Sequence, residues 1–172
     1  AGALDIRRDW VDVSDVVRGA VARAAKSFPS RRTATSVADG LPLIRGDAAL
    51  LEQVLLNLLD NAHKYSPPGS VTRIEARPSA GGVHIMVTDD GIGIPREDLQ
   101  KVFEKFYRVA GGDGRAPGTG LGLSICAAIV SAMGGTIAAR SPATSGKGTE
   151  ISILLPAGEA VPQTQTAAGD EA

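Results

Sequence analysis

The sequence predicts a two-layer α/β sandwich, in which a mixed β-sheet is covered by helices on one face. Helical and strand-like segments occur in groups along the chain, and some neighbouring strands are joined by short turns that indicate hairpins. With 172 residues, of which 43% are hydrophobic, the chain is large enough for one domain with a buried core. We therefore expect a single α/β domain.

The composition argues against several classes of protein. Lys and Arg total 18 and Asp and Glu total 19, so the basic excess typical of nucleic-acid binding is missing. Two histidines and the lone Cys126 do not suggest a transition-metal site or an internal disulfide, which suits a reducing compartment. No apolar run approaches the roughly 20 residues that span a bilayer, and AGALDIRR does not resemble a signal peptide. We expect an intracellular domain without a nucleic-acid partner.

Local signals define the elements in order. Valines and alanines recur on one side of the first helix, which Asp12 or Ser14 is suited to cap, and Asp47 is suited to cap the long second helix. A Ser-Ala-Gly-Gly turn indicates a hairpin, Pro95 favours a short third helix, and Gly134 ends the fourth. The expected helices lie within 10–28, 47–66, 95–104 and 121–133, and the expected strands at 32–38, 71–78, 82–89, 136–141 and 149–156.

The long helix carries polar residues beside its apolar stripe. Asn57, Asn61 and Lys64 lie at the edge of the stripe with i, i+4, i+7 spacing. An amide oxygen is a hard ligand for Mg²⁺, an ammonium group can contact phosphate, and the ring of Tyr65 can pack on a nucleobase. The alternative interpretation is an ordinary solvated helix face. His63 falls on the opposite side, where we expect it to face solvent.

Two glycine-rich segments follow elements that could position a ligand. DDGIGIP ends a strand, where Asp89 could accept a hydrogen bond from an exocyclic amine such as that of adenine, although the same residues can serve turn geometry alone. GTGLGLS opens a helix and leaves unobstructed amides that attract phosphate. The segment 108–119 before it has the composition of a lid, whereas Phe103 and Phe106 are expected to pack in the core.

Together these motifs resemble those of sensor histidine kinases. NLLDNAHKYS resembles the N box, DDGIGIP the first glycine box, FEKFYR the F box and GTGLGLS the second glycine box, in the family's order and spacing. The resemblance covers about residues 12–156, and four linked motifs are far more specific than any one of them. The segments RRDWVDV, LLEQVLLNLLDNAHKYSPPGS and LSICAAIVSAMGGTI are particularly similar to potassium sensor kinases of the KdpD type.

The resemblance implies an ATP-binding catalytic domain of the Bergerat, or GHKL, fold that uses Mg²⁺. It places Asn61 and Asn57 at the metal, and it implies that Asn57, Lys64 and Arg108 serve catalysis. The residues implied in nucleotide binding are Asn61, Lys64, Tyr65, Asp89, Gly91, Gly93, Ile94, Arg108, Gly118, Thr119, Gly120, Leu121, Gly122, Leu123 and Thr149.

This chain differs from the related ATPases at one residue that matters for the reaction. Those enzymes resemble one another in carrying a Glu four residues before the metal-binding Asn, where this chain has Asn57. An amide cannot take a proton from water, so efficient ATP hydrolysis is disfavoured. The family likeness implies instead that the γ-phosphoryl passes to a histidine of a separate dimerisation domain. A water-using ATPase of the same fold and a catalytically inert nucleotide-binding module stay open as alternatives.

The resemblance also implies a larger protein around this chain. We expect residues 1–11 to be the linker from a dimerisation domain, 12–156 to be the catalytic domain and 157–172 to be a disordered tail. The partners would be ATP, the protein's own phosphoacceptor domain and, through it, a response regulator. The full-length protein would be a homodimeric inner-membrane sensor, of which this chain would be a cytoplasmic, monomeric part.

Overall fold

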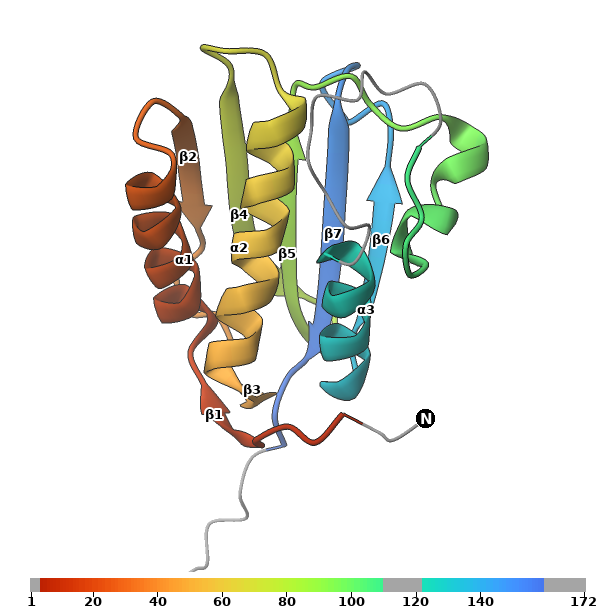
Figure 1. Ribbon diagram of the computed structural model, residues 1–172. Helices are drawn as coiled ribbons and strands as arrows, with labels where there is room; N and C mark the ends of the chain where they lie inside the picture. The colour runs from red at the N-terminus through yellow and green to blue at the C-terminus, as the bar shows by residue number, and fades with distance from the viewer. Residues whose placement is uncertain (1–3, 110–121, 160–172) are drawn as a thin grey trace, which may run out of the picture.

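The computed structural model describes residues 4–109 and 122–159, and its centre is a five-stranded mixed sheet (Figure 1). The strand order is β2-β4-β5-β7-β6, in which β2 and β4 pair in parallel and all other neighbours pair antiparallel. The strands are β2 (Arg32–Val37), β4 (Val71–Ser79), β5 (Gly82–Asp89), β6 (Thr136–Arg140) and β7 (Thr149–Pro156). The predicted hairpin of β4 and β5 and the predicted final strand pair are confirmed.

Three helices cover one face of this sheet (Figure 1). They are α1 (Val13–Ser27), α2 (Ala48–Tyr65) and α3 (Gly122–Ala132). The side chain of Asp12 accepts a hydrogen bond from the Ser14 amide, and that of Asp47 accepts one from the Leu50 amide, so both predicted helix caps are present. The predicted two-layer α/β sandwich is confirmed.

The core lies between the helices and the sheet. Leu51, Leu55 and Leu58 of α2 are almost fully buried, and Ile85 and Ile153 of the central strands are fully buried in the same cluster. The spacing of these leucines places them on one stripe of α2, which is the face predicted from the sequence. Helix α2 is the central helix of the layer and lies between α1 and α3 (Figure 1).

A small two-stranded sheet was not predicted from the sequence. Strand β1 (Asp9–Val11) pairs antiparallel with β3 (Ile44–Gly46), and the amide of Gly158 donates to the carbonyl of Leu43 just before β3. Three-residue strands are too short for an alternating pattern to show in the sequence. Backbone pairing therefore extends beyond the expected domain range of 12–156 at both ends.

The predicted short helix at 95–104 is instead two 3₁₀ turns, η1 (Arg96–Asp98) and η2 (Lys101–Phe103). The amide of Leu99 donates to the carbonyl of Arg96, three residues back, where an α-helix would reach four residues back.

Two side-chain expectations were wrong. Phe103 packs against the core as expected, but Phe106 is 71% exposed and has a positive φ of 63°. His63 is only 3% exposed, because its ring lies 5.2 Å from the ring of Phe28 and its Nδ1 lies 3.3 Å from the Thr72 hydroxyl. Since α2 is flanked by neighbouring elements on more than one side, a residue off its apolar stripe can still be buried.

Candidate functional site

Asp89, the last residue of β5, is held by backbone groups on two sides. Its Oδ1 accepts a hydrogen bond of 2.8 Å from the amide of Gly91, and the amide of Thr149, at the start of β7, also donates to the carboxylate. Burial raises the pKa of the Asp89 carboxyl above its ordinary value, and the two backbone hydrogen bonds act in the opposite direction. A carboxylate fixed in this way is an oriented hydrogen-bond acceptor at the end of the sheet.

Glycines bring three backbone segments together around Asp89. A Cβ atom on Gly91 would lie 2.4 Å from the carbonyl oxygen of Tyr65, and one on Gly148 would lie 1.9 Å from that of Asp89. Any side chain would therefore push the C-terminal end of α2 or the start of β7 away from the end of β5. The close packing at Gly91 and at Gly148 was not predicted from the sequence, which indicated only that Gly91 and Gly93 allow backbone to come close to a ligand.

The polar edge of α2 faces α3 and solvent. Asn57 and Asn61 are partly exposed, and the Asn57 side chain donates a hydrogen bond to the sulfur of Cys126 in α3. Burial raises the pKa of the Cys126 thiol to about 11, so the thiol is neutral at pH 7. The Nζ atom of Lys64 lies 2.9 Å from Oδ2 of Asp60, an i, i+4 pair at the surface that a stronger anion could replace.

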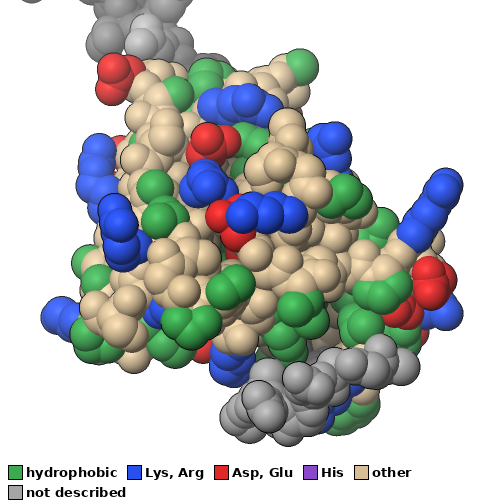
Figure 2. Space-filling model, turned by 90° about the horizontal axis from the view of Figure 1, so that it is seen from above, with side chains coloured by type: hydrophobic (Ala, Val, Ile, Leu, Met, Phe, Trp, Pro, Cys, Tyr) green, Lys and Arg blue, Asp and Glu red, His purple; other side chains and the backbone are tan. Residues whose placement is uncertain are grey.

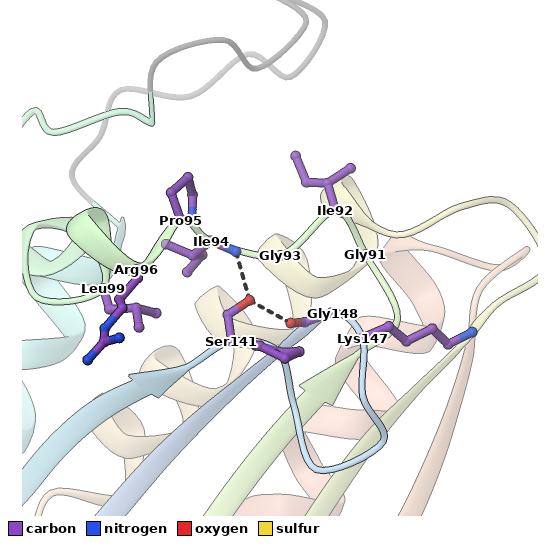
Figure 3. A pocket seen from close by; sticks show the side chains of 11 residues that line it. Gly91, Ile92, Gly93, Ile94, Pro95, Arg96, Leu99, Ser141, Lys147 and Gly148 are labelled. Atoms are coloured by element: carbon purple, nitrogen blue, oxygen red, sulfur yellow. Dashed lines mark hydrogen bonds between the residues drawn. The ribbon is translucent and has the colours of Figure 1, made fainter.

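A pocket of about 720 Å³ opens at the end of the sheet where Asp89 lies (Figure 3). One wall comes from residues between Gly91 and Leu99 and the other from the β6–β7 connection. In the view onto this end, acidic and basic side chains lie close together (Figure 2), and Oδ1 of Asp90 lies 3.4 Å from a guanidinium nitrogen of Arg73.

The pocket is lined by no residue of α2. Of the residues predicted to bind nucleotide, Gly91, Gly93 and Ile94 line the pocket, and the predicted residues of α2 do not. The glycine segment after β5 therefore has the pocket on one side and the α2 edge, through Tyr65, on the other. Tyr65 itself is 44% exposed at the end of α2.

The remaining predicted residues flank the glycine-rich segment in the sequence or lie at the start of β7. Gly122 begins α3, Leu123 packs against the core, Arg108 is exposed and Thr149 is buried. The predicted phosphate-binding residues Gly118, Thr119, Gly120 and Leu121, and most of the predicted lid at 108–119, lie outside the described residues.

This geometry agrees with a comparison against known families. The profile of the histidine kinase-, DNA gyrase B- and HSP90-like ATPases matches residues 46–159, which is more than half of the chain. The chain belongs to this family. The matched range includes α2, the end of β5 and the start of β7, which are the elements that form the candidate site.

Individual relatives narrow the assignment within the family. A solved mycobacterial sensor histidine kinase, MprB, has a TM-score of 0.76 and 32% identity, covering 89% of this chain and 99% of that one. The full-length ShkA structure in complex with AMPPNP has a TM-score of 0.78 and 29% identity, covering 94% of this chain and 34% of that one. The chain is thus a catalytic domain of the sensor histidine kinase type, as its motifs predicted.

A curated relative is much longer than the chain. Sensor protein KdpD of Clostridium acetobutylicum is 37% identical over 147 residues, which is 84% of this chain and 16% of KdpD. The chain therefore spans about a sixth of that relative's length. Across residues 4–109 and 122–159, no helix is both long and apolar enough to cross a membrane.

The family resemblance implies a divalent metal, and the amide oxygens on α2 are suitable donors for such an ion. The described part of the chain has no group of three or more His, Cys, Asp or Glu that could hold a metal ion by itself. Mg²⁺ does not require such a group, because it is usually held by one or two protein oxygens together with waters and substrate phosphates. The partly exposed Asn61 amide offers an oxygen of this kind, with Asn57 one turn away.

Two further residues contact the candidate site, and neither was predicted from the sequence to belong to it. Cys126 accepts the hydrogen bond of Asn57, and Ser141 hydrogen-bonds to the amide of Ile94. A cysteine on the apolar side of a helix is typical of core packing, and a serine after a strand is typical of a turn. Neither position carries a local signal, because its role depends on contacts with elements far away in the sequence.

Proposed function

We propose that this chain binds ATP together with Mg²⁺ and presents the γ-phosphoryl group for transfer to a histidine of a separate dimerisation domain. The observation that carries the proposal is the partly buried Asp89 carboxylate, held by the amides of Gly91 and Thr149 where Gly91 packs against the end of α2. Adenine offers an exocyclic amine as donor, and an oriented carboxylate acceptor selects for it over a base with a carbonyl at that position.

The phosphates would lie along α2 toward its N-terminal side. Asn61 would hold Mg²⁺ through its amide oxygen, and Lys64 would exchange its surface partner Asp60 for a phosphate oxygen. When bound, Mg²⁺ neutralises charge on the transferring phosphoryl group, which is the main demand of this chemistry. The assignment of Arg108 and of residues 118–121 to the phosphates rests on the resemblance of their motifs.

Transfer is favoured over hydrolysis because of residue 57. A water-using enzyme needs a general base that can take a proton, and the amide of Asn57 cannot do so. Its side chain donates to the Cys126 sulfur, so its orientation is tied to α3. The γ-phosphoryl group is therefore kept for a nucleophile brought by another domain. That step breaks the bond between the γ-phosphorus and the bridging oxygen of ATP and forms a bond to an imidazole nitrogen, with ADP as the leaving group.

The same proposal places the chain in a larger sensor protein. The similarity to KdpD, of which the chain covers 16%, supports a KdpD-type sensor at the inner membrane, with this domain in the cytoplasm. Residues 1–11 would lead from the dimerisation domain into β1, and the residues beyond Gly158, whose amide bonds the carbonyl of Leu43, would form a tail. The full-length protein would be a homodimer that passes phosphate to a response regulator, and the isolated chain would be a monomer.

A phosphotransfer assay tests the reaction. The chain is incubated with ATP labelled at the γ-phosphate, Mg²⁺ and the separately purified dimerisation domain of the same full-length protein. We expect the labelled phosphate to appear on that domain and little free phosphate to be released by the chain alone. Steady hydrolysis that Lys64→Ala abolishes, without transfer, would contradict it in favour of an ATPase. ATP binding without either reaction would contradict it in favour of an inert nucleotide-binding module.

A further inference from the structure

Ser141 stands where the ends of three strands meet. It follows β6 directly, and its Oγ accepts a hydrogen bond of 2.9 Å from the amide of Ile94 and donates one of 2.8 Å to the carbonyl of Gly148 (Figure 3). A hydroxyl group has one donor and two acceptor positions, so it can make both bonds at once. One side chain thus joins the segment after β5 to the connection between β6 and β7.

The surrounding backbone is packed tightly on this hydroxyl. A Cβ atom on Gly93 would lie 2.7 Å from the Ser141 Oγ, and Gly93 has a positive φ of 77°. On the other side, Gly148 lies against the backbone of Asp89 and precedes Thr149, whose amide donates to the Asp89 carboxylate. Ser141 is therefore connected to the Asp89 carboxylate by two short routes.

We propose that Ser141 is a positioning residue that holds segment 91–94 against Asp89 and thereby sets the preference of the site for adenine. This inference rests on the proposed function. Ser141 itself is not catalytic, because its hydroxyl is engaged by two backbone groups. Without that hydroxyl, the Ile94 amide and the Gly148 carbonyl lose their partner, and segment 91–94 is free to move away from the carboxylate that it orients.

The chain offers a matched control in the same connection. The hydroxyl of Ser145 donates to the carbonyl of Lys147 at 3.3 Å, so it also bonds backbone, but within the β6–β7 connection itself. Ser145→Ala removes a hydroxyl from the same connection without touching the link to Ile94. Ser141→Thr keeps a hydroxyl at the linking position and serves as the conservative variant.

The experiment combines amide exchange without nucleotide and calorimetric titrations with ATP and with GTP in Mg²⁺, at a temperature where every variant is folded. In Ser141→Ala we expect faster exchange of the Ile94 amide. We also expect about tenfold weaker ATP binding with little change for GTP, the size expected for one hydrogen bond that orients a binding group. Ser145→Ala and Ser141→Thr should behave as the unmodified chain.

Three results separate the possible failures. Unchanged Ile94 exchange in Ser141→Ala would overturn the link itself. Faster exchange with equal losses for ATP and GTP would show a merely structural role and overturn the positioning role. If the unmodified chain binds no nucleotide while Ser141→Ala still accelerates exchange, the proposed function fails and the link between Ser141 and Ile94 stands.

Discussion

The two sides of the candidate site are held by different kinds of contact. Around Asp89, backbone amides bond the carboxylate, and the backbone of Gly91 and Gly148 lies so close to neighbouring segments that no side chain fits. Along α2, by contrast, the polar groups are partly exposed side chains, and Lys64 pairs at the surface with Asp60.

The difference indicates how binding free energy is distributed. On the Asp89 side, which we propose binds the base and call the base side, the acceptor is oriented before a ligand arrives, so little conformational entropy would be lost on binding. On the α2 side, which we propose binds the phosphates, the side chains would have to exchange solvent and surface partners for the ligand. We therefore expect substitutions on the base side to have large effects on stability and selectivity, and substitutions on α2 to have smaller, metal-dependent effects.

The largest expected effect comes from closing the space at Gly148. An alanine there must adopt a positive φ, which costs about 1–2 kcal/mol, and its Cβ would meet the Asp89 carbonyl, which adds about 1–3 kcal/mol of overpacking. Gly146→Ala is the control, because Gly146 also has a positive φ but has open space around its Cβ position. Denaturant unfolding should show the larger loss for Gly148→Ala, and equal losses would contradict the close packing of the base side.

The next effect concerns the charge of Asp89. Asp89→Asn replaces a carboxylate that accepts two backbone hydrogen bonds, and we expect ATP binding to weaken by about 10- to 100-fold, the range for hydrogen bonds to a charged group. Asp90→Asn is the control, since the neighbouring Asp90 pairs with Arg73 and Lys147 instead. Calorimetric titration measures both variants, and equal losses would remove the special role of Asp89.

Asp89 also predicts a pH dependence of binding. Because burial raises the pKa of its carboxyl, Asp89 is protonated at a higher pH than an ordinary aspartate, and it then loses acceptor capacity. ATP affinity should fall as the pH falls through this raised pKa. The folded state binds this proton more readily than the unfolded chain does, so protonation of Asp89 itself favours folding and the lost affinity is not unfolding. Asp89→Asn should lack this component, whereas titration of the phosphates should persist in both proteins.

A smaller effect is expected on α2. Asn61→Ala should weaken binding of Mg²⁺–ATP about tenfold and leave binding of metal-free ATP nearly unchanged, because we propose that its amide oxygen binds the metal. Gln53→Ala removes an exposed amide from the same helix and should change neither titration. If Asn61→Ala weakens both titrations to the same degree, Asn61 contacts the nucleotide itself and has no role at the metal.

The smallest expected effect is on stability and arises from His63. Burial, followed by the charge of Arg31, lowers the pKa of His63, so below about pH 6.5 the unfolded chain takes up a proton before the folded chain does. The free energy of unfolding should therefore decline as the pH falls below this value. His84 contributes with the same sign, so His63→Leu should remove part of the decline. An unchanged pH profile in His63→Leu would show that His63 is solvated.

The sequence predicted the layers and most elements because their signals are local. The caps at Asp12 and Asp47 and the apolar stripe of α2 are readable within a few residues, and DDGIGIP marks Asp89 at the end of its strand. Contacts between distant segments left no such signal. The burial of His63 depends on Phe28 and Thr72, and the pairing of β1 with β3 joins two segments of three residues each.

The candidate site shows the same difference between local signals and contacts between distant segments. Its residue types were predicted from motifs, but the hydrogen bonds that hold them come from residues without a motif. Ser141 bonds Ile94, which lies 47 residues away in the sequence, and Cys126 bonds Asn57, which lies 69 residues away. Neither bond could be inferred before the strands and helices were placed. Where a side chain must be fixed for function, the fixing group is thus often far away in the sequence.

We propose that the oriented carboxylate of Asp89 at the end of β5 makes this domain a binding site for an adenine nucleotide. A calorimetric titration of the unmodified chain with ATP in excess Mg²⁺, repeated with GTP, tests it most directly. We expect saturable heat with one ATP per chain and clearly weaker binding of GTP. Absence of heat, together with an unchanged melting temperature at millimolar ATP, would contradict it.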